Sequence, residues 1–294
     1  MGAAIEHVNA LAPAAHELDS AYRYCSAYTR QHARHFYWAF AFMSPGRRRA
    51  IHAVYAFCQH ADQAVDEAPS IEQGRQRLDT LRDKLERMDS SREPVMLALR
   101  DTLERFPIRR ELLHQLLDGM EMDLTRQRYP DFAALSQYCW HVASVVGLMS
   151  IEIFGYRDPR VRQFAETLGL AMQLTNVARD VAEDAAEGRI YLPQDERLHH
   201  GVSDEDVIHG NFHSGFRTLM QEFCDRSDRL YDDAFALLPE SERSSMKPAL
   251  IMARLYRRLL VEIRARDHDV TRGKVRYPLW RKLWIALGTA LSWK

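Results

Sequence analysis

Apolar side chains recur along almost the whole chain at the spacing of an α-helix. One stripe occupies positions i, i+1, i+4, i+5 and i+8 of a single helix face and consists of Leu112, Leu113, Leu116, Leu117 and Met120. Similar stripes run through residues 51–57, 164–181, 216–237 and 250–263. No run of alternating β-branched residues with an Asn-Gly or Asp-Gly turn suggests a hairpin, so the pattern favours helices throughout.

Short polar segments that contain proline or glycine separate these stripes. They fall at residues 44–46, 68–70, 90–94, 129–131, 157–159, 187–188 and 238–239. Breaks this frequent predict roughly eight to ten helices. No fixed repeat and no shift in composition marks a boundary, so we predict one all-α domain over residues 1–294. Within it, residues 1–19 are predicted to be an N-terminal extension and residues 278–294 a peripheral C-terminal helix.

The composition is that of an ordinary globular protein. Of its 294 residues, 46% are hydrophobic and 28% are charged, and the formal net charge is −1. This balance gives no electrostatic reason to expect a nucleic-acid partner. The four cysteines, at positions 25, 58, 139 and 224, form no CxxC pair. We therefore expect buried thiols in a reducing compartment and no zinc site.

Nothing at the N-terminus has the basic and apolar blocks of a signal peptide. No stretch approaches the ~18–20 apolar residues that span a bilayer, because Ser144, Ser150 and Glu152 interrupt the most apolar run. We expect a cytoplasmic protein. The segment from Pro278 to Lys294 combines tryptophan with basic residues, a composition suited to peripheral contact with the inner face of a membrane. A terminal helix packed on the bundle would explain the same composition.

Two acidic rows differ from the amphipathic pattern around them. Asp62 and Asp66 are four residues apart, and Asn176, Asp180 and Asp184 repeat that spacing. Side chains four apart on a helix share a face, with Cβ atoms ~5–6 Å apart, and like charges so placed destabilise the helix. A cation would balance them, and Mg²⁺ is the natural choice because it prefers oxygen ligands and bridges carboxylates to phosphates.

The spacing alone is a weak signal, since a chain with 41 acidic residues contains many such pairs by chance. Asp79 and Asp83, in a polar segment, are interpreted as solvated surface charge. Asp118, Glu121 and Asp123 fit either surface charge or a position behind the metal ligands. The two rows stand apart because they lie in apolar, aromatic-containing helices.

Longer segments carry a family resemblance. Residues 173–194, QLTNVARDVAEDAAEGRIYLPQ, resemble the second aspartate-rich motif of the squalene/phytoene synthase family, and residues 55–67, YAFCQHADQAVDE, resemble the first. Residues 118–147 and 256–278 resemble further family blocks in the expected order. The resemblance covers about residues 20–284. It looks closest to bacterial presqualene diphosphate and squalene synthases, with phytoene synthases close behind.

The resemblance implies an isoprenoid-synthase helical bundle with a central active-site cavity. Two prenyl diphosphates, farnesyl or geranylgeranyl, would condense there head to head through a cyclopropyl intermediate and release diphosphate. The product would be presqualene diphosphate, squalene or phytoene, and NADPH would be used if squalene is formed. Ionising an allylic diphosphate requires neutralisation of the leaving group's charge, which fits Mg²⁺ held by two aspartate motifs that face each other across the cavity mouth.

The implied site has three sets of residues. Catalytic roles are expected for Tyr55, Tyr138, Asp62, Asp66, Asp180 and Asp184. Substrate binding is expected from His32, Phe36, Gln173, Asn176, Arg179, Arg189, Tyr191, Tyr256 and Lys274. The metal ligands would be Asp62, Asp66, Asn176, Asp180 and Asp184. Because the chain has no GxxxxGK[ST] loop, the phosphates would be held through the metal, with the two arginines as direct donors.

The first motif departs from the family pattern. Gln63 follows Asp62 where the family has a second acidic residue, Gln59 stands where an arginine is usual, and Lys274 also replaces an arginine. Each change removes a charge or alters a phosphate contact. Two alternatives therefore stay open: an enzyme that ionises one prenyl diphosphate to a monomeric terpene, and a non-catalytic relative that binds isoprenoids or assists assembly.

Overall fold

Helices account for nearly all of the regular structure in this chain. The computed structural model describes residues 15–32, 39–41 and 43–273. Within these ranges the only β-type pairing is one isolated parallel bridge between Arg128 and Ile190, so the all-α prediction is confirmed. The same ranges contain twelve α-helices, more than the roughly eight to ten predicted. Two of them are six residues long, which is too short to show a hydrophobic stripe.

The described helices are numbered in chain order. They are α1 (Ala15–His32), α3 (Pro45–Asp66), α4 (Ile71–Glu86), α5 (Pro94–Arg105), α6 (Arg110–Thr125), α7 (Phe132–Cys139), α8 (Val145–Phe154), α9 (Arg160–Ala186), α10 (Gln194–His199), α11 (Asp204–His209), α12 (Ser214–Leu237) and α13 (Lys247–Ala265). Three shorter segments are η1 (Met88–Ser90), η2 (Trp140–Ser144) and η3 (Glu240–Glu242).

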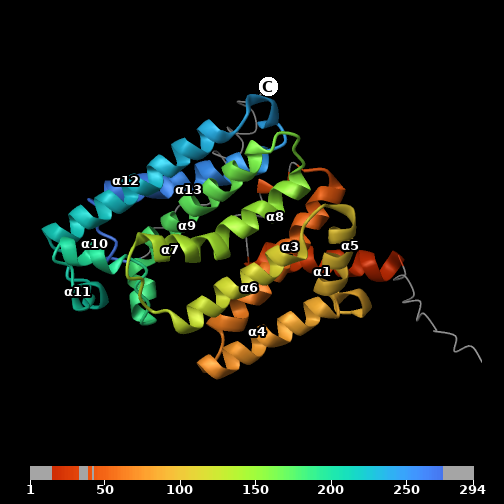
Figure 1. The fold of residues 1–294 in the computed structure, drawn as a ribbon, viewed down its shortest axis with the longest axis horizontal. Helices are drawn as coiled ribbons and strands as arrows, with labels where there is room; N and C mark the ends of the chain where they lie inside the picture. The colour runs from red at the N-terminus through yellow and green to blue at the C-terminus, as the bar shows by residue number, and fades with distance from the viewer. Residues whose placement is uncertain (1–14, 33–38, 42, 274–294) are drawn as a thin grey trace, which may run out of the picture.

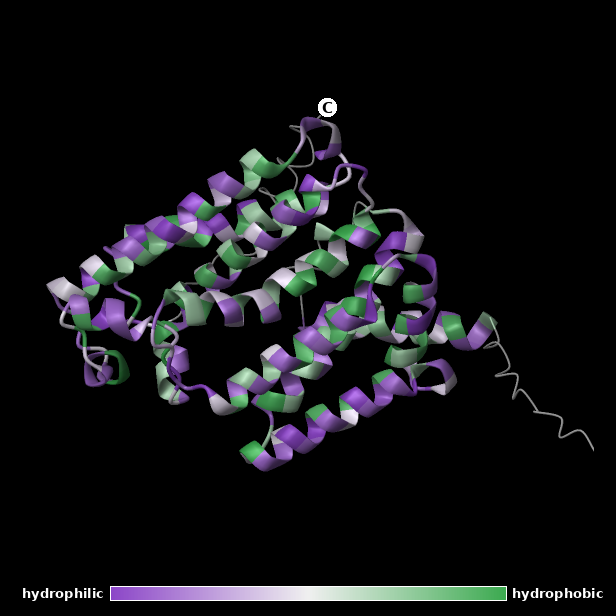
Figure 2. Ribbon diagram, in the orientation of Figure 1, coloured by the Kyte–Doolittle hydropathy of each residue, from purple (hydrophilic) through white to green (hydrophobic). Residues whose placement is uncertain are grey.

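The helices form two groups with α8 between them. Helix α3 packs against α1, α4, α5 and α6, and helix α9 packs against α12 and α13 (Figure 1). Helix α8 contacts α3 and α6 on one side and α9 on the other. The predicted stripe on α6 is buried along its whole length, and α4 alternates polar and apolar turns as an edge helix does (Figure 2). This arrangement brings α3 and α9, which carry the two acidic rows, to opposite sides of one interior.

Local sequence signals explain where these helices begin and end. Pro45 opens α3, where its fixed φ suits the first turn. The side chains of Ser70 and Asp131 cap α4 and α7 by accepting hydrogen bonds from the backbone N–H groups of Gln73 and Ala134. Gly155 ends α8 with a φ of +77°, a left-handed conformation that favours glycine. The predicted breaks thus coincide with chain turns.

Helix α7, η2 and α8 form one helical run, Phe132–Phe154, with a π-helical turn in its middle. By length and composition this run could cross a membrane, although the sequence was expected to contain no such stretch. It packs on α6 and α9, and the Ser144 hydroxyl inside it donates to the Glu166 carbonyl oxygen (2.7 Å). Those contacts are typical of a core helix in a helical bundle.

Helix α1 begins inside the predicted N-terminal extension. It starts at Ala15, and Glu17 and Asp19 form ion pairs with Arg92 (2.6 Å) and Arg49 (2.9 Å). Residues 15–19 are therefore helical and linked to the bundle by these ion pairs. The rest of that extension, the predicted C-terminal helix 278–294, and the expected site residues Phe36 and Lys274 lie outside the described residues.

Candidate active site

Two adjoining cavities lie between α3 and α9. One has a volume of about 240 Å³ and mainly apolar walls, and the other has a volume of about 250 Å³ and mainly polar walls. They adjoin because both are lined by Asp62, Met120, Val142, Gln173 and Asn176. The interior is therefore a polar compartment that continues into an apolar chamber.

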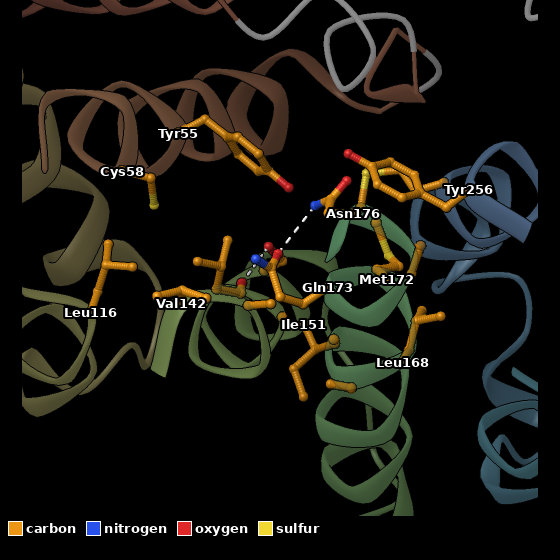
Figure 3. Close-up of a pocket in the computed structure, with 18 of the residues that line it drawn as sticks. Tyr55, Cys58, Leu116, Val142, Ile151, Leu168, Met172, Gln173, Asn176 and Tyr256 are labelled. Atoms are coloured by element: carbon orange, nitrogen blue, oxygen red, sulfur yellow. Dashed lines mark hydrogen bonds between the residues drawn. The ribbon is translucent and has the colours of Figure 1, made fainter. Parts of the chain in front are cut away.

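Side chains from helices α3, α6, α8, α9 and α13 line the apolar chamber. They include Cys58 of α3, Leu116 of α6, Ile151 of α8, and Leu168 and Met172 of α9. The hydroxyl groups of Tyr55 and Tyr256 point toward Asn176 from opposite sides (Figure 3). The chamber walls are thus mainly apolar, and the chamber opens into the polar compartment, which suits a ligand with a hydrocarbon chain and a polar head.

The polar compartment gathers both acidic rows. Its lining includes Asp62 and Asp66 from α3 and Asp180 and Asp184 from α9, together with Asp123 from α6. Arg179 and Arg189 are the cations in this lining, so five carboxylates face two guanidinium groups. Such an excess of negative charge in a recess favours a bound cation.

Two carboxyl groups in this compartment, those of Asp62 and Asp184, have raised pKa values. Burial, followed by the charges of Asp66 and Asp123, raises the pKa of Asp62 to about 7. Burial, followed by the charge of Asp180, raises the pKa of Asp184 to about 7. Burial is the larger cause of both shifts and the neighbouring anions add to it, and a divalent cation would favour the ionised form of both groups.

Asp123 is a site residue that sequence reasoning left undecided. Its two carboxylate oxygens accept hydrogen bonds from the hydroxyls of Tyr138 (2.9 Å) and Tyr191 (2.7 Å). Burial raises the pKa of Asp123 to about 6, and these two phenol hydrogen bonds oppose the rise. By contrast, Asp118 and Glu121 pair with Arg82 away from the cavity, which makes them surface charges. The only sequence signal for Asp123 was its place in the 118–147 block.

The two arginines are each tied to an acidic row. Arg179 donates through Nε to Oδ1 of its neighbour Asp180 (2.8 Å). Arg189 reaches across to Asp66 on α3 (3.4 Å) and also pairs with Glu187. The predicted donors therefore lie between the carboxylates, where they could contact a phosphate held there.

The donor set fits Mg²⁺ shared with a substrate. Within the described residues, no three His, Cys, Asp or Glu side chains lie close enough to form a complete metal cage. Mg²⁺ does not need one, since it commonly takes one or two carboxylates, phosphate oxygens and water. Asn176 supports this fit, because its Nδ2 donates to Gln173 (3.1 Å) while its Oδ1 is buried and accepts no hydrogen bond.

Not every expected residue reaches the cavities. Tyr55, Tyr256, Gln173 and Asn176 line the apolar chamber, and Tyr138, Arg179, Arg189 and Tyr191 line the polar compartment. His32 instead lies exposed at the end of α1 and stacks on Tyr28, with ring centroids 4.4 Å apart. The Tyr28 hydroxyl donates to Gln63, so that glutamine links α1 to α3 rather than lining either cavity. Gln59 lines the apolar chamber.

Comparisons with known proteins agree with this architecture. A profile of the squalene/phytoene synthase family matches residues 29–281. Phytoene synthase 2 of Solanum lycopersicum is 39% identical over 260 residues, which cover 86% of this chain and 84% of that protein. The 15-cis-phytoene synthase of Synechococcus elongatus is 34% identical over 280 residues, covering 90% and 91%. Some plant relatives are longer, and the chain spans 63% of the phytoene synthase of an Oncidium hybrid.

Solved structures share the fold. A dehydrosqualene synthase crystallised with a ligand superposes with a TM-score of 0.83 at 26% identity, covering 94% of this chain and 97% of the other. A squalene synthase from Alicyclobacillus acidocaldarius superposes with a TM-score of 0.79 at 25% identity, covering 89% and 99%. The described helices thus follow the arrangement of known isoprenoid synthases.

Proposed function

We propose that this chain, which belongs to the squalene/phytoene synthase family, condenses two prenyl diphosphates head to head in an Mg²⁺-dependent reaction and releases diphosphate. Membership of the family makes it a prenyltransferase, an enzyme that transfers alkyl groups. The observation that carries the proposal is the polar compartment lined by both acidic rows and continuous with an apolar chamber. A prenyl diphosphate has the same two parts.

The polar compartment would hold the diphosphate end. Asp62, Asp66, Asp180 and Asp184, with Asn176, would hold Mg²⁺. Bound Mg²⁺ would supply Lewis-acid neutralisation of the leaving group's charge. Arg179 and Arg189 now contact the carboxylates of Asp180 and Asp66. When phosphate oxygens take the place of these carboxylates, both arginines would donate directly to the phosphate.

The apolar chamber would protect the reacting carbon chain. Its walls exclude water from an allylic cation, which water would otherwise capture as an alcohol. The aromatic faces of Tyr55 and Tyr256 border the same space and can stabilise positive charge through their π-electrons. Their buried hydroxyls stay protonated, because burial, the first cause in each case, raises both pKa values.

Among the products, we favour phytoene from geranylgeranyl diphosphate. The relatives named above at 39% and 34% identity carry the name phytoene synthase. Squalene or presqualene diphosphate is the second candidate, favoured by the fold similarity to a dehydrosqualene synthase and a squalene synthase. Forming phytoene consumes no reductant, so NADPH would enter only if squalene is the product.

We place the protein in the cytoplasm, with peripheral contact at a membrane that receives its hydrocarbon product. The apolar chamber supports a greasy product, and the tryptophan-rich segment 278–294 is a suitable anchor by composition. The plant relatives are named chloroplastic, which describes those proteins. Liposome flotation of full-length protein and of a 1–277 truncation tests the contact, because only full-length protein should float.

A product assay tests the reaction. Purified protein is incubated with Mg²⁺ and either farnesyl or geranylgeranyl diphosphate, with and without NADPH. A C40 hydrocarbon from geranylgeranyl diphosphate supports phytoene formation, and a C30 product or its cyclopropyl diphosphate supports the second candidate. A monomeric terpene would replace head-to-head coupling with single-substrate ionisation. Tight binding without turnover would instead indicate a non-catalytic isoprenoid-binding protein.

A further inference from the structure

The loop that follows α9 delivers two side chains to the polar compartment. Residues 187–193 form this loop, and Arg189 and Tyr191 from it line the cavity. The backbone N–H of Arg189 donates to the carbonyl oxygen of Asp184 (2.8 Å), and the N–H of Ile190 donates to the carbonyl oxygen of Gln127 (2.9 Å). On the cavity side, Tyr191 and Arg189 also contact Asp123 and Asp66. Loops generally have lower local stability than the helices they join, so contacts outside the cavity can help to fix this loop.

Three charged side chains brace the other side of the loop. Asp204, the first residue of α11, accepts from Arg128 Nε through Oδ2 (2.5 Å) and pairs with Arg197 Nη2 through Oδ1 (2.8 Å). We call these the Arg128–Asp204–Arg197 triad. Both arginines also grip the loop itself, because Arg128 donates to the carbonyl oxygen of Gly188 (2.7 Å) and Arg197 Nε to that of Leu192 (3.2 Å). The triad therefore holds the loop on both sides of Arg189 and Tyr191.

The Arg197 side chain of the triad is buried, so breaking its ion pair with Asp204 would destabilise the protein. Arg197 is 1% exposed, and a buried guanidinium that loses its carboxylate partner is strongly destabilised. Burial acts to raise the pKa of Asp204, but the hydrogen bonds from Arg128 and the charge of Arg197 outweigh it and keep the pKa below its usual value. Asp204 is consequently ionised at neutral pH and joins two loop-holding arginines at once. Helices α10 and α11, which contribute Arg197 and Asp204, lie at one end of the bundle (Figure 1).

The geometry points to Asp204 and Arg128 as positioning residues, which hold Arg189 and Tyr191 in place for the diphosphate of the substrate without lining the polar compartment themselves. This inference rests on the proposed function for the identity of the ligand. It assigns a role in substrate binding to a triad whose carboxylate is partly exposed and does not line either cavity. Small displacements of groups that position a substrate are enough to change binding and rate substantially.

A double-mutant cycle on the full-length protein tests the inference. The measurement is the dissociation constant of inorganic diphosphate with Mg²⁺ by titration calorimetry, which requires no turnover. We expect Asp204→Asn to weaken binding about tenfold, because Arg189 is then no longer held in position to contact the diphosphate. Arg189→Gln should weaken binding by a similar factor. The double variant should bind more tightly than the product of the two single effects predicts, since Asp204 acts in part through Arg189.

A matched control separates positioning from general damage. Asp232→Asn removes an ion pair with Arg257 between α12 and α13, away from the loop. It should leave diphosphate binding unchanged and add nothing to Arg189→Gln. If Asp204→Asn does not fold, Arg128→Gln replaces it, because that variant leaves the ion pair between the buried Arg197 and Asp204 intact.

The outcomes distinguish this inference from the proposed function. Unchanged binding in Asp204→Asn, or effects of Asp204→Asn and Arg189→Gln that multiply in the double variant, would overturn the positioning role even if the wild type forms product. Failure of the wild type to form product would overturn the proposed reaction, whereas a non-multiplicative cycle for diphosphate would still support the positioning role.

Discussion

The carboxylate of Asp66 and the guanidinium of Arg189 lie 3.4 Å apart, although 123 residues separate them in the sequence. Asp66 ends α3, and Arg189 follows α9, so the contact links the segments that carry the two acidic rows along the lining of the polar compartment. Asp66 is half exposed, so the pair contributes little to stability. The contact matters because it holds the Arg189 guanidinium in the polar compartment, where it can donate to a phosphate.

Loss of one carboxylate from the second row should stop the reaction. Asp184→Asn keeps the side-chain shape but removes a charge from the lining, and we expect turnover to fall by at least about a hundredfold. Asp83→Asn is the matched control, because Asp83 belongs to an equally spaced pair on the exposed surface of α4. Product formation with Mg²⁺ and thermal unfolding are measured for both. Normal rates in Asp184→Asn would remove it from the set of metal ligands.

Metal and diphosphate should stabilise the protein together. Mg²⁺ with inorganic diphosphate should raise the melting temperature more than either alone, because each completes the other's coordination in the polar compartment. At a free-ligand concentration of 100 times Kd, the expected gain is about 2.7 kcal/mol. Differential scanning fluorimetry detects this shift, and EDTA should abolish both the shift and turnover. An identical shift in Asp62→Asn would show that the metal binds elsewhere.

The acidic rows could be predicted from sequence because their geometry is local. Four-residue spacing on a helix fixes the relative positions of Asp180 and Asp184 whatever the rest of the chain does. The same applies to the α6 stripe, all of which is buried. The family resemblance then supplied the pairing between α3 and α9, which spacing alone does not encode.

The remaining features depend on tertiary contacts that leave little trace in the sequence. Asp123 enters the site only because two tyrosines from other segments donate to it, and it is one of 41 acidic residues. His32 was predicted from its motif position to bind substrate. Its ring stacks on Tyr28 at the exposed end of α1 and lines neither cavity. The helices α10 and α11 were missed because six residues are too few to show a hydrophobic stripe. Asp204 was missed because its partner Arg128 is 76 residues away in the sequence.

A buried histidine should make stability depend on acidity. Burial, helped by the charge of Arg48, lowers the pKa of His52 to about 4, against 6.5 in the unfolded chain. Between these values the unfolded state binds the extra proton, so this contribution to stability is full above about pH 6.5 and is lost as the pH falls toward 4. The loss is up to about 3 kcal/mol.

Comparison with a variant isolates this contribution from the carboxyl groups of the polar compartment, whose raised pKa values act in the opposite direction. The free energy of unfolding in urea is measured for wild type and His52→Gln at pH 7.5 and pH 5. The variant should lose less stability between the two pH values than the wild type. Equal losses would mean that the folded protein protonates His52 as readily as the unfolded chain does.

A close backbone approach sets the width of the apolar chamber. A Cβ atom on Gly169 of α9 would lie 2.6 Å from the Cα atom of Ser144 in η2, a contact that only a shift of the backbone can relieve. Alanine is intrinsically better than glycine in a helix by about 1 kcal/mol, yet the forced separation should cost more. We therefore expect Gly169→Ala to destabilise the protein by about 1–3 kcal/mol.

Gly46→Ala is the matched control, because a Cβ atom at that position in α3 would meet no atom within 4 Å apart from its chain neighbours and the adjacent helix backbone. It should not destabilise the protein and should stabilise it by up to about 1 kcal/mol. Since η2 contributes Val142 and Ala143 to the chamber, Gly169→Ala should also raise KM for the prenyl diphosphate, whereas Gly46→Ala should not. Urea unfolding and steady-state kinetics measure both effects. Equal stability of the two variants would show that η2 moves aside freely and does not fix the chamber wall.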